Sequence, residues 1–207
     1  MKTTFSAVDV DVDAQPLPVV DAIVVGASAG GVEALLKVFA RLRAGYRLPI
    51  LTVLHVPEER RSQLAQVFQA RLPVPVKEAD DKEDIAPGTL YFAAPGYHLS
   101  VENDLSLSLS QEDRVFHSRP SIDILFQSAA DAYGPRVAGF LLTGANNDGA
   151  FGLSCIKLSG GMTVIQDPAQ AQARAMPEAG LALIEPDYLL PLDDIGQLLV
   201  ELERIAC

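Results

Sequence analysis

Almost purely apolar stretches alternate along this chain with segments of helical periodicity. The stretch DAIVVG at 21–26 comes directly before apolar residues at helical spacing, and the stretches at 49–56 and 136–144 are likewise followed by helical patterns. Strands without polar alternation are typical of a parallel sheet that is covered on both faces. Strands that alternate with helices indicate right-handed crossover connections. The sequence therefore predicts an α/β fold, a doubly wound, mostly parallel sheet flanked by helices in a Rossmann-like, three-layer arrangement.

The remaining segments fit the same plan and add a β-hairpin. Residues 98–110, HLSVENDLSLSLS, alternate between polar and apolar about Asn103 and Asp104, which predicts two strands joined by a tight turn. Residues 1–20 are acidic and largely aperiodic, so we expect a flexible acidic tail followed by one domain over 21–207. Further strands are expected at 88–95 and 162–168, and further helices at 58–72, 121–134 (with Ser121 as N-cap), 149–161 and 194–206.

Charge and composition exclude several classes of protein. The 207 residues carry a net charge of −11, whereas binding to nucleic-acid phosphates needs clustered Lys and Arg, so no nucleic-acid partner is expected. The two cysteines form neither a disulfide framework nor a zinc ligand set, and we expect no metal. No apolar run reaches transmembrane length, and the acidic N-terminus does not resemble a signal peptide. We expect a cytoplasmic protein that does not insert into a membrane.

Three polar side chains follow three of the predicted buried strands. Ser28 comes after the first strand, His55 ends the second, and Asp148 lies in the loop after the strand at 136–144. In a doubly wound sheet, reactive groups gather beyond the carboxyl ends of the strands. A hydroxyl, an imidazole and a carboxylate at one edge form the set that a nucleophilic serine needs. Histidine accepts the proton of the serine, and the carboxylate orients the imidazole.

The turn that carries Ser28 has two competing interpretations besides a nucleophile. Residues 26–30, GASAG, satisfy G-x-S-x-G, a sharp strand-to-helix turn that exposes the serine hydroxyl, but this signal is weak on its own. Ser28 could instead be a helix N-cap. A dinucleotide-binding loop would need glycine in place of Ser28 and an acidic residue where the second strand ends in His55, so the sequence disfavours it.

Other residues of the same types compete for the roles of base and carboxylate. His98 and His117 lie in polar or hairpin segments and fit a structural or surface role better than that of a base. Asp123 falls in the first turn of a predicted helix, where a carboxylate is favoured in any case. Asp167 follows the strand at 162–168 and reaches the same edge as Asp148. Topology alone does not separate Asp148 from Asp167.

Six motifs occur in order along the chain. They are GASAGG at 26–31, His-x-Pro at 55–57, AAPGYHL at 93–99, RPSIDILFQSAA at 119–130, LLTGANNDGAFG at 141–152 and MPEAGLA at 176–182. Together they resemble the catalytic domain of the chemotaxis protein-glutamate methylesterases (CheB-type enzymes), and the resemblance covers nearly the whole chain from residue 21 onward. It implies a triad in the chain order Ser28, His55 and Asp148, with no catalytic role for Asp167.

The chain departs from this family at two positions that line the site. Ala29 stands where the family usually has Thr, and Ala145 where it usually has Met. The resemblance assigns the oxyanion contacts to backbone N–H groups near Ala29 and Ala145, which any residue except proline supplies. It also points to Arg61 and Ser62 as substrate-contacting residues. We therefore expect catalysis to survive both departures.

The resemblance implies a cofactor-free serine hydrolase that removes methyl groups from glutamate γ-methyl esters on chemoreceptor-like proteins and releases methanol. Deamidation of receptor glutamines would use the same mechanism. Only about twenty residues precede the first strand, so we expect a domain without the receiver domain of the family's longer members, regulated, if at all, by a separate protein. The alternatives are a small-molecule carboxylesterase and a catalytically silent interaction module.

Overall fold

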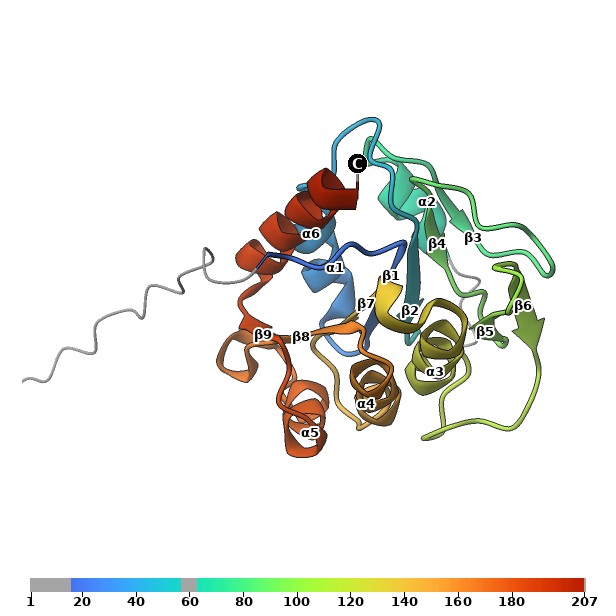
Figure 1. Ribbon diagram of the computed structural model, residues 1–207. Coiled ribbons are helices and arrows are strands. Elements are labelled where there is room, and N and C mark those ends of the chain that lie inside the picture. Colours follow the sequence, from blue (N-terminus) through green and yellow to red (C-terminus); the bar gives the residue numbers. More distant parts are fainter. Residues whose placement is uncertain (1–15, 57–62, 207) are drawn as a thin grey trace, which may run out of the picture.

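The computed structural model describes residues 16–56 and 63–206, which form a seven-stranded sheet between two layers of helices (Figure 1). The strand order is β3-β4-β2-β1-β7-β8-β9, and every neighbouring pair is parallel. The predicted doubly wound α/β fold is confirmed. The strands are β1 Ala22–Ala27, β2 Ile50–Leu54, β3 Val76–Glu78, β4 Leu90–Phe92, β7 Val137–Leu141, β8 Met162–Gln166 and β9 Tyr188–Leu190.

Helices cover the sheet on both faces and create two separate apolar cores. Helices α1 (Gly31–Phe39), α2 (Leu64–Gln69) and α6 (Leu192–Ala206) pack on one face (Figure 1). Helices α3 (Ile122–Tyr133), α4 (Ala150–Leu158) and α5 (Ala175–Leu183) pack on the other. Within residues 16–56 and 63–206, none of these helices has the length and apolar character needed to cross a membrane.

Strand β1 shows why the central strands carry no polar alternation. Its six residues are all buried. Ile23 and Val25 contribute to the core under α1 and α6, whereas Val24 between them contributes to the core under α3 and α4. Successive side chains of a strand point to opposite faces, so a strand covered on both sides must be apolar throughout.

The predicted hairpin is present as a separate antiparallel pair. Strand β5 (His98–Val101) pairs with β6 (Leu107–Ser110), and Val101 lies opposite Leu107. The Leu105 N–H donates to the Glu102 carbonyl over 2.9 Å, so Asn103 and Asp104 are the central residues of the turn, as predicted. The Glu102 N–H donates to the Ser106 carbonyl over 2.9 Å, so Leu105, with φ of 64°, is an additional residue of the loop.

Three short elements were not expected from the sequence, and each has a physical reason. Strands β3 and β9 have three residues each and form the two edges of the sheet, so neither contains a long apolar run. Helix α5 contains Pro177 and Gly180, both of which suggest a break in a helix. Pro177 falls in the first turn, where its missing N–H costs little. A Cβ on Gly180 would lie 2.9 Å from Ile165 Cδ1, so the glycine allows α5 to pack against β8.

The helix expected over 58–72 is shorter in the described structure. Helix α2 spans six residues, Leu64–Gln69, and residues 57–62 lie outside the described part of the chain. Residues 1–15 also lie outside it, so the predicted acidic tail stays a prediction. Val20, which was assigned to that tail, is fully buried in the core under α1 and α6.

Candidate active site

The order of the strands brings Ser28, His55 and Asp148 to one edge of the sheet. Strand β1 lies between β2 and β7, and the three residues follow these three strands in the chain. Backbone hydrogen bonds hold the three strand ends together. The His55 N–H donates to the Ala27 carbonyl over 3.1 Å, and the Ser28 N–H donates to the Thr143 carbonyl over 2.9 Å. The site therefore lies at the switch in strand order, where open α/β sheets place their ligands.

The three side chains form a continuous hydrogen-bonded row. His55 Nδ1 lies 3.3 Å from Ser28 Oγ, and His55 Nε2 lies 2.9 Å from Asp148 Oδ2. Because a carboxylate only accepts hydrogen bonds, it selects the neutral tautomer that carries hydrogen on Nε2. That tautomer leaves the lone pair of Nδ1 directed at the Ser28 hydroxyl. The geometry is that of a base placed to accept the serine proton at Nδ1.

Asp148 is buried and held at both carboxylate oxygens. Its Oδ1 accepts hydrogen bonds from Ser121 Oγ (2.8 Å) and the Asp123 N–H (3.0 Å), and its Oδ2 accepts one from the Ile122 N–H (2.8 Å) besides His55. Burial by itself raises the pKa of Asp148, but the hydrogen bonds from His55, Asp123 and Ile122 outweigh it and place the pKa below its ordinary range. Asp148 is thus a carboxylate at neutral pH, and it also binds the N-terminus of α3, where negative charge is favoured.

The two other candidate carboxylates have different partners. Asp167 caps the short 3₁₀ helix Pro168–Gln170 through the Ala169 N–H, over 2.9 Å. Asp123 Oδ1 accepts the Gly152 N–H at the start of α4 over 2.6 Å. Burial, together with the charge of Asp148, raises the pKa of Asp123 to about 6, against the opposing hydrogen bonds from backbone N–H groups. Of the three candidates, Asp148 is the one whose carboxylate contacts His55.

The turn at Ser28 does not use its hydroxyl as a cap. Helix α1 has Gly30 as its N-cap residue, with φ of 77° and no side-chain capping bond, so the N-cap interpretation of Ser28 is wrong. A Cβ on Gly30 would lie 2.4 Å from Gln172 Oε1, which means that Gln172 covers the glycine closely. In this conformation a side chain on Gly30 would be strained as well as crowded.

The backbone N–H groups of Ala29 and Ala145 lie on the adjacent loops after β1 and β7. Within residues 16–56 and 63–206, neither group has a hydrogen-bond acceptor. Both residues are exposed. Unpaired backbone donors of this kind can bind a developing oxyanion when they point at the same position. Arg61 and Ser62, the predicted substrate contacts, lie outside the described residues.

His98 has a structural role, as expected. It is fully buried, its Nδ1 accepts the Ser121 N–H over 3.1 Å, and its Nε2 lies 3.1 Å from the Asp113 carbonyl. Burial is the main cause that lowers the pKa of His98 below its ordinary value of 6.5. The ring is therefore neutral and donates from Nε2. It links the two ends of the segment 113–121.

This neutral ring predicts a loss of stability in mild acid. Below pH 6.5 the unfolded chain protonates His98 while the folded chain does not, so the free energy of unfolding falls as the pH falls. The slope contributed by one such group is at most about 1.4 kcal/mol per pH unit. Urea unfolding of the parent and of His98→Gln at pH 7.5 and pH 5.5 measures this change in the free energy of unfolding. The parent should lose more stability between these conditions than the variant, and equal losses would contradict the assignment.

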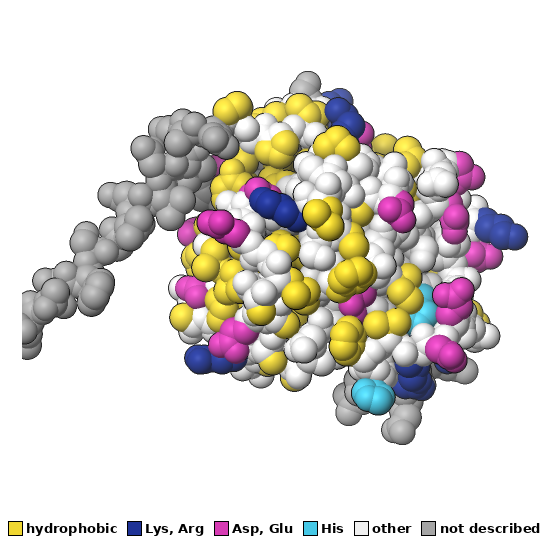
Figure 2. Space-filling model, turned by 60° about the horizontal axis from the view of Figure 1, so that its bottom comes forward, with side chains coloured by type: hydrophobic (Ala, Val, Ile, Leu, Met, Phe, Trp, Pro, Cys, Tyr) yellow, Lys and Arg dark blue, Asp and Glu magenta, His cyan; other side chains and the backbone are white. Residues whose placement is uncertain are grey.

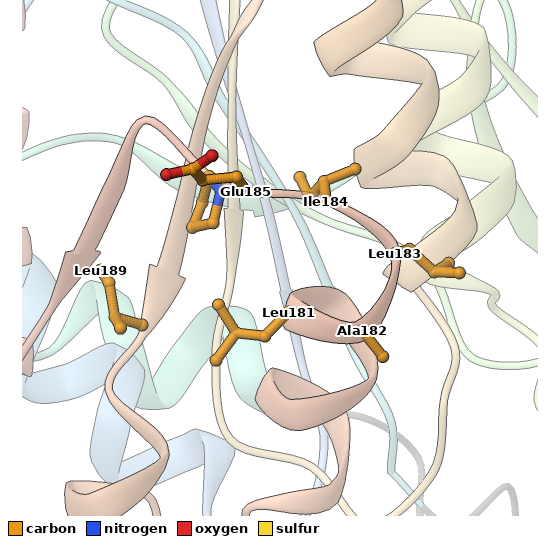
Figure 3. A pocket seen from close by; sticks show the side chains of 7 residues that line it. Leu181, Ala182, Leu183, Ile184, Glu185 and Leu189 are labelled. Carbon is orange, nitrogen blue, oxygen red and sulfur yellow. The ribbon is translucent and has the colours of Figure 1, made fainter.

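Two pockets differ in their volume and in the residues that line them. A pocket of about 190 Å³ adjoins His55 and is lined also by Val56, Arg114, Pro120 and residues 117–119. A larger one of about 510 Å³ is lined by residues 181–186 and Leu189 (Figure 3). The larger pocket lies at the segment that leads into β9, at the amino edge of the sheet, and its side chains are apolar apart from Glu185. Of the three side chains in the row, His55 lines the smaller pocket.

Charged side chains are scattered over one face of the protein. On the face shown in Figure 2, the Lys and Arg side chains stand apart from one another among acidic and apolar side chains. In the described part of the chain, no group of three or more His, Cys, Asp or Glu residues is arranged to hold a metal ion.

The sequence did not predict three contacts in and around the row of side chains. Ser121 was expected as the N-cap of α3, which is confirmed by its bond from the Ile124 N–H, but it also donates to Asp148. Thr143 Oγ1 donates to the Ala29 carbonyl over 2.8 Å and so fixes the loop after Ser28. Ser118 Oγ lies 3.5 Å from His55 Nδ1. Ser121 and Thr143 lie within the motifs at 119–130 and 141–152, whereas none of the six motifs includes Ser118.

Comparison with known proteins gives matches over most of the chain. The family described as CheB methylesterase matches residues 23–199. A Leptospira interrogans protein, provisionally named a protein-glutamate methylesterase/protein-glutamine glutaminase, is 39% identical over 89% of this chain and 95% of its own length. A Clostridium acetobutylicum protein of the same name, without the provisional qualifier, is 30% identical over 89% of this chain and 54% of its own length. The CheB methylesterase catalytic domain of Thermotoga maritima matches with a TM-score of 0.84 and 29% identity, over 88% of this chain and 98% of that one.

Proposed function

The chain belongs to the CheB methylesterase family, and from this membership we propose that it is a serine hydrolase that removes methyl groups from glutamate γ-methyl esters of chemoreceptor-like proteins. The names of the relatives from Leptospira interrogans and Clostridium acetobutylicum support the ester and the glutamyl side chain. The observation that carries the proposal within this chain is the row Ser28–His55–Asp148, with contacts of 3.3 Å and 2.9 Å.

The first half of the reaction follows from that row. Ser28 Oγ attacks the ester carbonyl carbon while its proton passes to His55 Nδ1. Asp148 stabilises the resulting imidazolium through Nε2. The negative charge on the former carbonyl oxygen is held by the N–H groups of Ala29 and Ala145, which have no other acceptor in the described residues. His55 then protonates the methoxy oxygen, the bond between carbon and that oxygen breaks, and methanol leaves.

The second half returns the enzyme to its starting state. A water molecule gives a proton to His55 Nδ1 and attacks the acyl carbon. The bond to Ser28 Oγ breaks, the serine recovers the proton, and a glutamate carboxylate is released. The same steps hydrolyse a glutamine side chain, with ammonia in place of methanol. The second half of the relatives' names, protein-glutamine glutaminase, supports this second activity.

The partner that follows from this activity is a methylated receptor or receptor-like signalling protein, whose glutamyl esters the enzyme would meet in the cytoplasm. A protein of net charge −11 repels an acidic helix at long range. We therefore assign recognition to local cationic side chains, first of all Arg61, together with the hydroxyl of Ser62 next to it. A separate regulatory protein would supply any control of the activity.

A substrate panel distinguishes this function from the two alternatives. The enzyme should release methanol from a helical peptide that contains glutamate γ-methyl ester faster, in kcat/KM, than it hydrolyses p-nitrophenyl esters of two to eight carbons. Faster turnover of the p-nitrophenyl series would favour a small-molecule carboxylesterase. A fluorophosphonate probe should label Ser28 in the parent. No labelling and no hydrolysis would favour a silent interaction module.

Removal of divalent metals should leave the activity unchanged. The proposed steps use one hydroxyl, one imidazole, one carboxylate and backbone N–H groups, and these complete the reaction without a Lewis acid. The measurement is the initial rate of methanol release before and after dialysis against a chelator. Loss of activity that added zinc or magnesium restores would replace this mechanism with a metal-assisted one.

A further inference from the structure

A second hydroxyl faces the same nitrogen of His55 as the nucleophile does. Ser118 Oγ lies 3.5 Å from His55 Nδ1, and Ser28 Oγ lies 3.3 Å from it. Ser28 follows strand β1, whereas Ser118 precedes helix α3, so the two hydroxyls reach the ring from different elements. Ser118 takes no part in the proposed attack by Ser28 on the ester.

The turn before Ser118 has an unfavourable backbone conformation. Val115 and Ser118 pair through two backbone hydrogen bonds, 3.1 Å and 2.8 Å long, and enclose a two-residue turn. The enclosed residues, Phe116 and His117, have φ of 46° and 64°. Such turns normally carry Asn or Gly, because bulky side chains are strained in the left-handed region. Strain of this kind persists where the surrounding structure enforces it, and it is often found at functional sites.

The segment around this turn is fixed at both ends. The buried His98 ring joins the Asp113 carbonyl to the Ser121 N–H, with both contacts at 3.1 Å. Arg119 Nη1 donates to the carbonyl groups of Gln111 and Glu112, each over 2.9 Å. These hydrogen bonds at both ends of the segment therefore hold Ser118 beside His55.

The space next to Ser118 can hold water. The pocket of about 190 Å³ beside His55 is lined by Ser118, with Arg119 and Pro120 next to it. A single water needs about 30 Å³ of volume, so the pocket holds several. Two atoms 3.5 Å apart can both contact one water at a normal hydrogen-bond length of about 2.8 Å. A water so placed touches both Ser118 Oγ and His55 Nδ1.

We propose that Ser118 binds the water that hydrolyses the acyl-enzyme. This inference rests on the proposed function and concerns its second half. Once Ser28 is acylated, it has no proton to share with His55 Nδ1, and the water takes its place there. Ser118 Oγ accepts one hydrogen of this water while the other hydrogen passes to Nδ1. The water oxygen forms the new bond to the acyl carbon, the bond to Ser28 Oγ breaks, and Ser28 takes the proton from Nδ1.

The test separates formation of the acyl-enzyme from its decay. Ser118→Ala, Ser118→Thr and the parent are acylated with p-nitrophenyl acetate. Nitrophenolate release gives the acylation rate, and intact mass after removal of the substrate follows the decay. Ser159→Ala, at the far end of α4, serves as the matched control. Thermal unfolding of each variant tests whether the fold is kept.

The expected result is a selective effect. Ser118→Ala should slow decay of the acyl-enzyme roughly tenfold or more, as for loss of one positioned hydrogen-bonding group, and change acylation less than twofold. Ser118→Thr, which keeps the hydroxyl, should decay within about threefold of the parent, and Ser159→Ala should match the parent. Unchanged decay in Ser118→Ala, or an equal loss in both steps, would overturn the inference. Failure of the parent to release methanol from a glutamate γ-methyl ester peptide, together with absence of any acyl group on Ser28, would instead overturn the proposed function.

Discussion

Alanine in place of Ser28 should lower kcat/KM for ester hydrolysis by roughly 10³-fold or more, the size of loss that is typical for the nucleophile of a triad. The fold should remain, because the backbone contacts of Ser28 to Thr143 and Gly31 do not involve the side chain. The hydroxyl does not cap α1, and its contact to His55 is 3.3 Å long. Initial rates on a γ-methyl ester peptide measure the loss.

Two controls keep this result interpretable. Circular dichroism should give the variant the same unfolding midpoint as the parent within about 2 °C, which corresponds to a change in the free energy of unfolding of at most about 1 kcal/mol. A fluorophosphonate probe should label the parent and leave Ser28→Ala unlabelled. Activity of the variant within tenfold of the parent would refute the assignment of Ser28 as the nucleophile.

Asparagine in place of Asp148 should reduce kcat on the order of 10⁴-fold, the effect described for the type case of the Ser-His-Asp triad. In Asp148, Oδ2 accepts hydrogen bonds from His55 Nε2 and from the Ile122 N–H. An asparagine NH₂ group in the place of Oδ2 would be a donor facing these two donors. The variant would favour the imidazole tautomer with hydrogen on Nδ1, which cannot accept the serine proton. Loss of the carboxylate also weakens the binding of Asp148 to the N-terminus of α3, so the variant should be less stable than the parent.

Asp167→Asn is the matched control for that variant. Asp167 comes at the same edge of the sheet but caps the short helix Pro168–Gln170. An asparagine oxygen can keep this cap, so the rate should stay within about threefold of the parent. A larger loss of kcat for Asp167→Asn than for Asp148→Asn would show that the wrong carboxylate has been assigned.

The periodicity of the sequence predicted the central sheet because its strands are buried on both faces. Strands β1, β2 and β7 consist almost entirely of apolar residues, with Thr52 of β2 as the polar exception, and this pattern is visible in the sequence without any tertiary information. The edge strands β3 and β9 escaped prediction because three residues against one neighbour need no apolar run. The sequence also predicted where the polar residues of the site gather. In a parallel sheet the carboxyl ends of all strands lie at one edge, so residues that follow the strands come together there.

Residues whose roles depend on long-range contacts could not be found in this way. Asp148 and Asp167 both follow buried strands, and what separates them is that Asp148 faces the N-terminus of α3 and His55. Ser118 comes close to His55 only because a strained turn and the His98 ring hold its segment in place. Its position depends on packing between distant segments, which neither composition nor spacing reveals.

The central claim is that this chain hydrolyses glutamyl methyl esters through Ser28. The most direct measurement is the release of labelled methanol from a purified chemoreceptor fragment that carries radiolabelled γ-methyl esters, incubated with the parent or with Ser28→Ala. We expect release proportional to the amount of parent enzyme, loss of label from the receptor in equal amount, and release by the variant at the level of the buffer alone. Intact label on the receptor after incubation with the parent, or equal release by Ser28→Ala, would contradict the claim.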